Sequence, residues 1–366
     1  MKTLRALLVT SGCLLTTAAF AQISLTPPAA QTPPAASKAA PKQPPAKAPA
    51  KAPEAAKKAP DAAKKASDAA KKAPTAKQPD KAEEPVDPRA DLVYGAYQRG
   101  MYKTALDLAT KRATENNDPK AMTMLGELYS NGIGIKRNYQ QAAEWYKRAA
   151  DRGDREAMFA LAMLRLSERT NPGGRDEAVK LLASSAKLGN PKAAYNLALL
   201  YLDGQTLPQD VKRSAELLRQ AADVGNPEAQ YALATFYKEG TGVEKDVDKA
   251  VRLLQAASMA DNVDAEVEYA IALYNGTGTP KNEAAAITLL RKAARQNSPI
   301  AQNRLARVLA MRTNTDDRLE GLRWHIVAKT AGKGDLMLDE LLANANPQER
   351  AQAQQAASKW LGSGLK

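Results

Sequence analysis

Few residues of this 366-residue chain have the types and spacing with which enzymes do chemistry. His325 is the only histidine and stands beside Trp324, and Cys13 is the only cysteine. A serine or cysteine nucleophile needs a base within hydrogen-bonding reach, and a zinc site needs several Cys or His ligands. One histidine and one cysteine meet neither requirement, so the sequence predicts no catalytic residue and no metal site.

Two further groups of polar residues give the same result. The stretch "TNPGGR", residues 170–175, contains two glycines but lacks the lysine and the strand-to-helix setting of a phosphate-binding loop. Carboxylates such as Glu127, Glu228 and Asp264 stand on expected helices without a partner acid or base, which is typical of solvated helix faces. We therefore expect no cofactor and no enzyme activity, and we look for the function in a binding surface.

The first residues predict export from the cytoplasm. Lys2 and Arg5 precede an apolar run over residues 6–20 that is too short for a stable membrane anchor. A small-x-small motif ending at Ala21 then fits a signal-peptidase site. The expected signal peptide is residues 1–21, with cleavage between Ala21 and Gln22 and a periplasmic or secreted mature chain. No other segment is long and apolar enough to be a transmembrane segment.

A lipoprotein signal ending at Cys13 is the alternative interpretation of the same residues. Thr10 then occupies the position where a branched apolar residue is wanted, and the apolar run before Cys13 is very short. Cleavage after Ala21 is therefore favoured. It removes the only cysteine, so the mature chain contains no disulfide and must be stabilised by packing.

Residues 22–88 consist mainly of Ala, Pro and Lys, and they hold 14 of the 22 prolines. No large apolar residue occurs between Thr26 and Pro85, so burial cannot offset the entropy cost of folding. We expect a disordered linker. Residues 22–90 contain 13 Lys and Arg against 7 Asp and Glu, a net of +6 of the chain's +13. Such a basic linker either binds an anionic envelope polymer or serves as a solvated spacer; nucleic acid is not expected as a partner.

From residue 91 onward the chain repeats every 36 residues. Three positions of each 36-residue unit, which we call columns because they recur in every unit, hold small or apolar residues. The three positions are spaced i, i+4 and i+5, so they lie on one face of a helix. The first column is alanine, the second is mostly leucine four residues later, and the third is Gly or Ala one residue further on. Their members are Ala121, Ala157, Ala193, Ala229, Ala265 and Ala301; Leu125, Leu161, Leu197, Leu233, Tyr269 and Leu305; and Gly126, Ala162, Ala198, Ala234, Ala270 and Ala306.

A glycine turn and a second helix follow each of these faces. Gly132, Gly240 and Gly276 suit a left-handed helix C-terminus, and Asp154, Asn190 and Asn226 are candidate N-caps. Each unit is thus a helical hairpin that buries its apolar side by stacking. The sequence predicts an all-α fold, an α-solenoid of about six 36-residue hairpins over residues 89–332 with capping helices over residues 333–366. The turns in "RLSERTNPGG" and "RTNTDD" depart from the pattern, but the helices are expected to stay in phase.

The units "AQYALATFYKEGTGVEKDVDKAVRLLQAAS" and "AMTMLGELYSNGIGIKRNYQQAAEWYKRAA" resemble the Sel-one-like repeat (SLR) family of the tetratricopeptide-repeat superfamily, exported bacterial type. The resemblance covers roughly residues 118–332. It implies a protein–protein interaction scaffold or adaptor in the bacterial cell envelope. Two alternatives remain: a periplasmic regulator that restrains a sensor kinase or a polysaccharide-production system, and a structural envelope tether that acts through the lysine-rich linker.

The resemblance also implies that the first helix of each hairpin lines a concave face. Two columns then look inward: Thr123, Phe159, Tyr195, Tyr231, Val267 and Asn303; and Glu127, Met163, Leu199, Thr235, Ile271 and Arg307. The apolar and aromatic middle of both columns is the candidate partner-binding site, made of Phe159, Met163, Tyr195, Leu199 and Tyr231. Glu127 and Arg307 are expected at a polar rim. The alternative is that the tyrosine column packs between hairpins.

Overall fold

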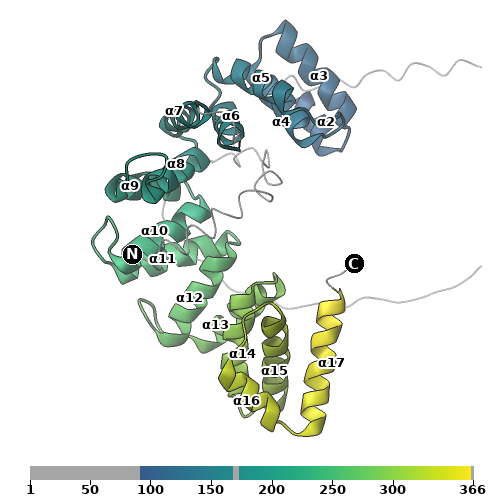
Figure 1. The fold of residues 1–366 in the computed structure, drawn as a ribbon, viewed down its shortest axis with the longest axis vertical. Coiled ribbons are helices and arrows are strands. Elements are labelled where there is room, and N and C mark those ends of the chain that lie inside the picture. Colours follow the sequence, from purple (N-terminus) through teal and green to yellow (C-terminus); the bar gives the residue numbers. More distant parts are fainter. Residues whose placement is uncertain (1–90, 168–172, 364–366) are drawn as a thin grey trace, which may run out of the picture. The chain divides into compact units, whose positions relative to one another are not determined.

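The computed structural model describes residues 91–167 and 173–363 (Figure 1). The expected signal peptide, the lysine-rich linker and residues 170–172 of the "TNPGGR" stretch lie outside these residues. All regular elements of the described part are helices, and none of them is long and apolar enough to cross a membrane. The helices are α2 (Leu92–Gln98), α3 (Tyr102–Glu115), α4 (Pro119–Asn131), α5 (Tyr139–Ala150), α6 (Arg155–Ser167), α7 (Gly174–Lys187), α8 (Pro191–Asp203), α9 (Val211–Asp223), α10 (Pro227–Glu239), α11 (Val247–Met259), α12 (Val263–Asn275), α13 (Glu283–Arg295), α14 (Pro299–Ala310), α15 (Thr315–Thr330), α16 (Leu336–Asn344) and α17 (Pro347–Ser363).

Six of the helix pairs form a regular series, from α4/α5 to α14/α15. Their first helices begin 36 residues apart, from Pro119 to Pro299. From α2 to α15, Figure 1 shows each helix lying beside the next one along the chain, so every hairpin of the series packs on its neighbours. The α2/α3 pair precedes the series, and α17 packs on α15 at its other end. The predicted all-α solenoid of about six hairpins with capping helices is confirmed.

Local signals at the helix ends explain the regular boundaries. The side chains of Asp154, Asn190 and Asn226 each accept a hydrogen bond from the backbone N–H three residues later, at 2.7–3.0 Å, as N-caps do. Gly240 and Gly276 end α10 and α12 with φ angles of 77° and 73°, in the left-handed region that glycine adopts without strain. The predicted caps are confirmed.

The turn from one hairpin to the next contains a residue with positive φ at a 36-residue period. Gly153, Gly189 and Gly225 have φ angles of 85°, 82° and 87°. At the corresponding turns Asp261 and Asn297 adopt φ angles of 60° and 61°. Asp and Asn tolerate this conformation better than other non-glycine residues, so these turns keep their geometry after glycine is lost.

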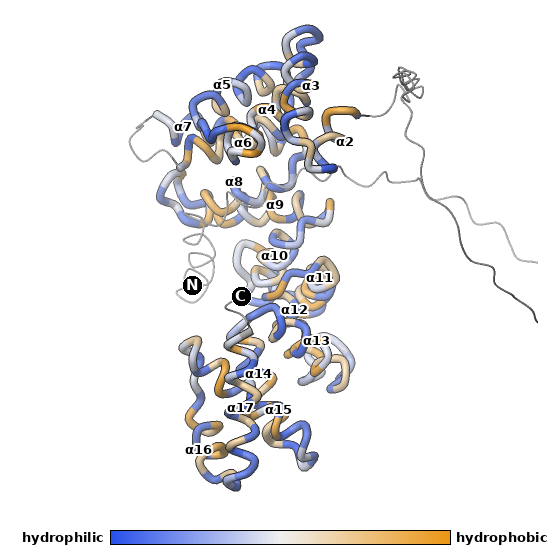
Figure 2. The backbone as a smooth tube through the Cα atoms, turned by 90° about the vertical axis from the view of Figure 1, so that its right-hand side faces the viewer, coloured by the Kyte–Doolittle hydropathy of each residue, from blue (hydrophilic) through white to orange (hydrophobic). Residues whose placement is uncertain are grey.

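The core lies between the helices of each hairpin and between neighbouring hairpins. The alanine column is at most 2% exposed, and all alanines of the third column are at most 1% exposed. Figure 2 shows hydrophobic and hydrophilic stretches on the same helices, as expected for helices that each bury one side. Because small residues fill two of the three columns, neighbouring helices approach closely, and the fold depends on this close packing.

The first regular hairpin, α4/α5, differs from the others at two positions that contact each other. Gly126 replaces the alanine, and the Tyr146 ring lies against it, since an added Cβ at Gly126 would come within 2.5 Å of the ring. The position equivalent to Tyr146 is leucine in the next four hairpins, at Leu182, Leu218, Leu254 and Leu290. The smaller residue on α4 therefore compensates for the larger one on α5.

The last hairpin has a reshaped turn. Only residues 311–314 join α14 to α15, whereas residues 276–282 join α12 to α13. Asn314 caps α15 by accepting from the backbone N–H groups of Asp316 and Asp317. With the shorter turn, α15 begins one helical turn early, and Gly321 becomes the point of close approach to Ala310 of α14.

Candidate functional site

The five residues predicted to bind a partner all lie on first helices of consecutive hairpins. Phe159 and Met163 are on α6, Tyr195 and Leu199 on α8, and Tyr231 on α10. Met163, Tyr195, Leu199 and Tyr231 are half-buried, so each combines packing contact with access to solvent. Phe159 is different, because it is 8% exposed and belongs to the core cluster of α6–α10. Most of the surface of the Phe159 side chain is therefore covered by core packing.

The side chains of Tyr195 and Tyr231 both pack against the core and remain partly exposed to solvent. The Tyr195 ring packs on the core cluster of α6–α10, and the Tyr231 ring packs on a cluster formed with α11 and α12. Burial, followed by the nearby carboxylates of Glu228 and Asp264, raises the pKa of Tyr195 to about 12. Burial, followed by Asp264 and Glu268, likewise raises the pKa of Tyr231. Both phenols thus stay neutral and keep their O–H groups as hydrogen-bond donors.

The carboxylates around these rings come from two successive hairpins, with Glu228 on α10 and both Asp264 and Glu268 on α12. Asp264 stands on α12, yet it lies near enough to Tyr195 of α8 to affect its pKa, although α10 intervenes along the chain. Asp264 is exposed, but the surrounding protein and the Glu268 carboxylate raise its pKa. We call Tyr195, Tyr231, Glu228, Asp264 and Glu268 the acidic tyrosine strip.

The partners of these carboxylates differ. Lys238 Nζ of α10 lies 2.8 Å from Glu268 Oε2. The Glu228 Oε2 atom accepts a hydrogen bond from the Asn226 side chain at 2.9 Å, a neutral donor. Within residues 91–167 and 173–363, neither Glu228 nor Asp264 has an ion pair. The strip therefore carries two carboxylates that form no ion pair with the residues that the structure describes.

Glu127 does not form part of a polar rim or a solvated helix face, as the sequence predicted. It is 1% exposed, and burial raises its pKa to about 8 against a smaller opposing effect of Lys192. The Tyr97 hydroxyl of α2 lies near it, but neither carboxylate oxygen has a hydrogen bond of ordinary geometry in the described chain. The prediction was wrong because the α2/α3 hairpin, which stands outside the 36-residue pattern, covers this end of the column. Arg307 at the other end pairs with Asp335.

His325 occupies a structural position. It is fully buried on α15, and its Nε2 atom lies 2.8 Å from Asp339 Oδ1 of α16. Lys329 Nζ lies 2.7 Å from the same oxygen, and Lys329 is the main cause that lowers the pKa of Asp339. The contact ties α16 to α15. Among the residues that the structure describes, no group of Asp, Glu, His or Cys could hold a metal ion.

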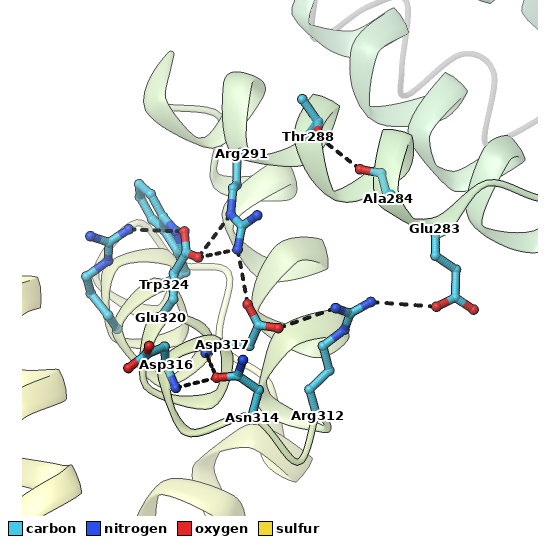
Figure 3. Close-up of polar contacts among 11 residues, drawn as sticks. Glu283, Ala284, Thr288, Arg291, Arg312, Asn314, Asp316, Asp317, Glu320 and Trp324 are labelled. Carbon is cyan, nitrogen blue, oxygen red and sulfur yellow. Dashed lines mark hydrogen bonds and ion pairs between the residues drawn. The ribbon is translucent and has the colours of Figure 1, made fainter.

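A denser polar cluster joins α13 to α15 (Figure 3). The Arg291 guanidinium lies 2.7 Å from Glu320 and 3.2 Å from Asp317, and Arg312 lies 3.3 Å from Asp317 and 3.6 Å from Glu283. Trp324 Nε1 donates a hydrogen bond to Glu320 at 3.1 Å. In Figure 3 each of these carboxylates points toward a guanidinium of the chain. With Arg323, which lies 3.6 Å from Glu320, three arginines balance these three carboxylates, and the cluster holds the reshaped last hairpin against its neighbour.

Comparison with known proteins agrees with this division into repeats. Residues 119–154, 155–190, 191–226, 227–262 and 263–298 each match the Sel1 repeat. These boundaries coincide with the starts of α4, α6, α8, α10 and α12. The matches end at residue 298, before α14 and the reshaped turn that follows it. Among curated protein sequences, none matches the chain.

The solved structures that are similar to this chain include a Sel1 repeat protein and a protein with an SLR fold. A Sel1 repeat protein from Oxalobacter formigenes is 26% identical, with a TM-score of 0.59; the match covers 65% of this chain and 98% of that one. The protective antigen c5321 of uropathogenic Escherichia coli, which displays an SLR fold, is 22% identical with a TM-score of 0.60. That match covers 73% of this chain and 63% of c5321.

Sel1 repeat proteins serve as protein–protein interaction scaffolds. The sequence resemblance, the hairpin geometry and the five matched segments agree on residues 119–298, and the chain belongs to the Sel1 repeat family.

Proposed function

We propose that this protein is a non-enzymatic scaffold of the bacterial cell envelope that binds a protein partner on the first helices of hairpins α6/α7 to α12/α13. The observation that supports this most directly is the half-burial of Tyr195, Leu199 and Tyr231 in adjacent repeats. Aromatic anchors that are already ordered by packing lose little entropy when a partner covers them. The envelope location rests on the signal-like residues 1–21 alone.

The burial of Phe159 is the reason that we leave it out of the proposed site. Phe159 is a core residue, and its truncation is expected to destabilise the fold by about 3–5 kcal/mol, which would hide any effect on binding. Tyr195, Leu199 and Tyr231, with Met163 at one edge, therefore form the proposed contact surface.

Site-specific photocrosslinking in envelope extract tests the proposal. A benzophenone side chain replaces Leu199 or Thr235, which are both accessible on first helices, and Gln220 or Gln255 on the second helices serves as control. We expect one crosslinked protein, identified by mass spectrometry, at the first two positions and not at the controls. Equal crosslinking at all four positions, or crosslinking at the controls alone, contradicts the proposed face.

A further inference from the structure

Charge is divided between the two helices of the central hairpins. The first helices α8, α10 and α12 contain six carboxylates and two lysines, a net of −4. The second helices α9, α11 and α13 contain four carboxylates and eight Lys or Arg, a net of +4. The flanking first helices α6 and α14 carry no such acidic excess. Of the six carboxylates, Glu266 is buried and paired with Lys292 of α13, and Glu268 is paired with Lys238. The acidic excess on the surface of the acidic tyrosine strip therefore rests on Glu228 and Asp264, in a chain whose total charge is +13.

The two lysines of these first helices form an ion pair with only one carboxylate of the strip. Lys238 is paired with Glu268, and Lys192 lies near the buried Glu127. Glu228 and Asp264 therefore remain without a cation in the described chain, although both are exposed and available to one. Their combined charge favours a positively charged ligand at short range.

Two other tyrosines of the chain, Tyr237 and Tyr274, each have a lysine ammonium group over the ring, a contact that Tyr195 and Tyr231 do not make with the described residues. Lys249 Nζ lies 5.4 Å from the centroid of the Tyr237 ring, and Lys281 Nζ lies 5.8 Å from that of Tyr274. Lys249 is paired with Asp246, and Lys281 with Glu283. These cations thus sit between a tyrosine ring and a carboxylate. Tyr195 and Tyr231 offer the same combination with no cation from the described residues.

We propose that the acidic tyrosine strip binds a lysine- or arginine-bearing segment of the partner protein, with a cationic side chain over Tyr195 or Tyr231 and in contact with Glu228 and Asp264. This inference rests on the proposed function and names the chemistry of the partner. A ring face and a carboxylate attract the same cation, so both contribute to its affinity. Glu268 is paired with Lys238, so we do not assign it a contact with the incoming cation.

Fluorescence anisotropy with labelled peptides of equal length tests the inference on the full chain. The probes alternate Ala with Lys, Gln or Glu. We expect the Ala/Lys peptide alone to bind. Glu228→Gln combined with Asp264→Asn should weaken its affinity by about tenfold, because two attractive charges are lost. Melting curves of this variant should stay close to those of the parent, since neither carboxylate has an ion pair and a charge in the first turn of a helix makes only a small contribution to stability.

The matched control is Glu216→Gln combined with Asp248→Asn. It removes the same charge from exposed positions on the second helices α9 and α11, and it should change the affinity less than about twofold. Equal weakening by both pairs overturns the inference in favour of general charge attraction. Equal binding of the Ala/Gln peptide overturns it in favour of an apolar contact. Retained crosslinking at Leu199 without Ala/Lys binding overturns the cationic partner and leaves the proposed scaffold standing.

Discussion

Arg291 in the last part of the solenoid lies within 3.2 Å of two carboxylates, Glu320 and Asp317, whereas Glu228 and Asp264 in the central hairpins form no ion pair with the described residues. Both regions are rich in charge, and both stand on helices of the same kind. Charges that are paired across hairpins stabilise a turn that has lost its usual glycine cap. Charges that are left unpaired on accessible helices cost the fold little and remain available to a ligand.

The largest expected loss of stability comes from the close contact between α14 and α15 in the last hairpin, which acts alongside its ion pairs. Gly321→Ala places a Cβ 2.5 Å from the backbone nitrogen of Ala310, which cannot move as a side chain can. We expect a loss of about 3 kcal/mol in the free energy of unfolding, measured by urea denaturation. Gly362→Ala is the control, because nothing lies within 4 Å of a Cβ there. Similar midpoints for the two variants would show that α15 does not approach α14 as described.

The second effect extends the comparison to the first regular hairpin, which is held by a matched pair rather than by charges. Gly126→Ala drives a methyl group into the Tyr146 ring and should cost about 1–3 kcal/mol. Tyr146→Leu restores the residue found in the next four hairpins and should recover part of that loss in the double variant. Additive losses in a double-mutant cycle of thermal unfolding would disprove the compensation.

The ion-pair cluster itself should contribute less than either packing contact. Arg291→Gln leaves Glu320 and Asp317 without their main cation, and we expect a loss of about 1–2 kcal/mol in urea, reduced at high salt. Arg252→Gln, at an exposed position of α11, is the matched control and should change stability by less than about 0.5 kcal/mol. A salt-independent loss at Arg291 would point to packing of its aliphatic part instead.

A smaller, pH-dependent effect distinguishes a buried unpaired carboxylate from the exposed ones of the strip. Because the pKa of Glu127 is raised from 4.5 to about 8, the folded chain holds a proton there that the unfolded chain releases. This contribution to stability is fully present below about pH 4.5 and is lost as the pH rises through about 8. Glu127→Gln should therefore melt higher than the parent at pH 9, with a smaller difference at pH 5.

The exposed Glu144 of α5 provides the control for this pH series. Glu144→Gln should leave the difference in melting temperature from the parent constant between pH 5 and pH 9. A flat difference for Glu127→Gln as well would contradict the burial of its charge.

The sequence was sufficient for the hairpins because their columns of Ala and Leu keep an uninterrupted 36-residue period. It also contained the signal for the exception in the first hairpin, since Gly126 and Tyr146 both depart from their columns. The burial of Glu127 could not be predicted, because α2 and α3 lie outside the repeat and their packing is a long-range property. The sequence "RTNTDD" at the start of α15 was visible as a departure from the glycine-turn pattern. The ion pairs between α13, α15 and this turn could not be predicted from it.

The candidate site could be predicted only in part, for a similar reason. The columns placed Tyr195 and Tyr231 on the correct helices, yet Glu228 and Asp264 looked like ordinary solvated carboxylates. Their proximity to the tyrosines depends on how α8, α10 and α12 stack, since Asp264 affects a ring two hairpins away. Phe159, by contrast, has the same column position as the tyrosines and is buried by its neighbours.

One paired measurement tests the central claim that paired charges stabilise this fold and unpaired charges bind. The urea midpoint and the affinity for the Ala/Lys peptide are measured for Arg291→Gln and for Glu228→Gln combined with Asp264→Asn. We expect the first variant to lose stability and keep its affinity within about twofold, and the second to keep its midpoint and lose about tenfold in affinity. If both variants change the same quantity, stability or affinity, the division of roles between the two regions is contradicted.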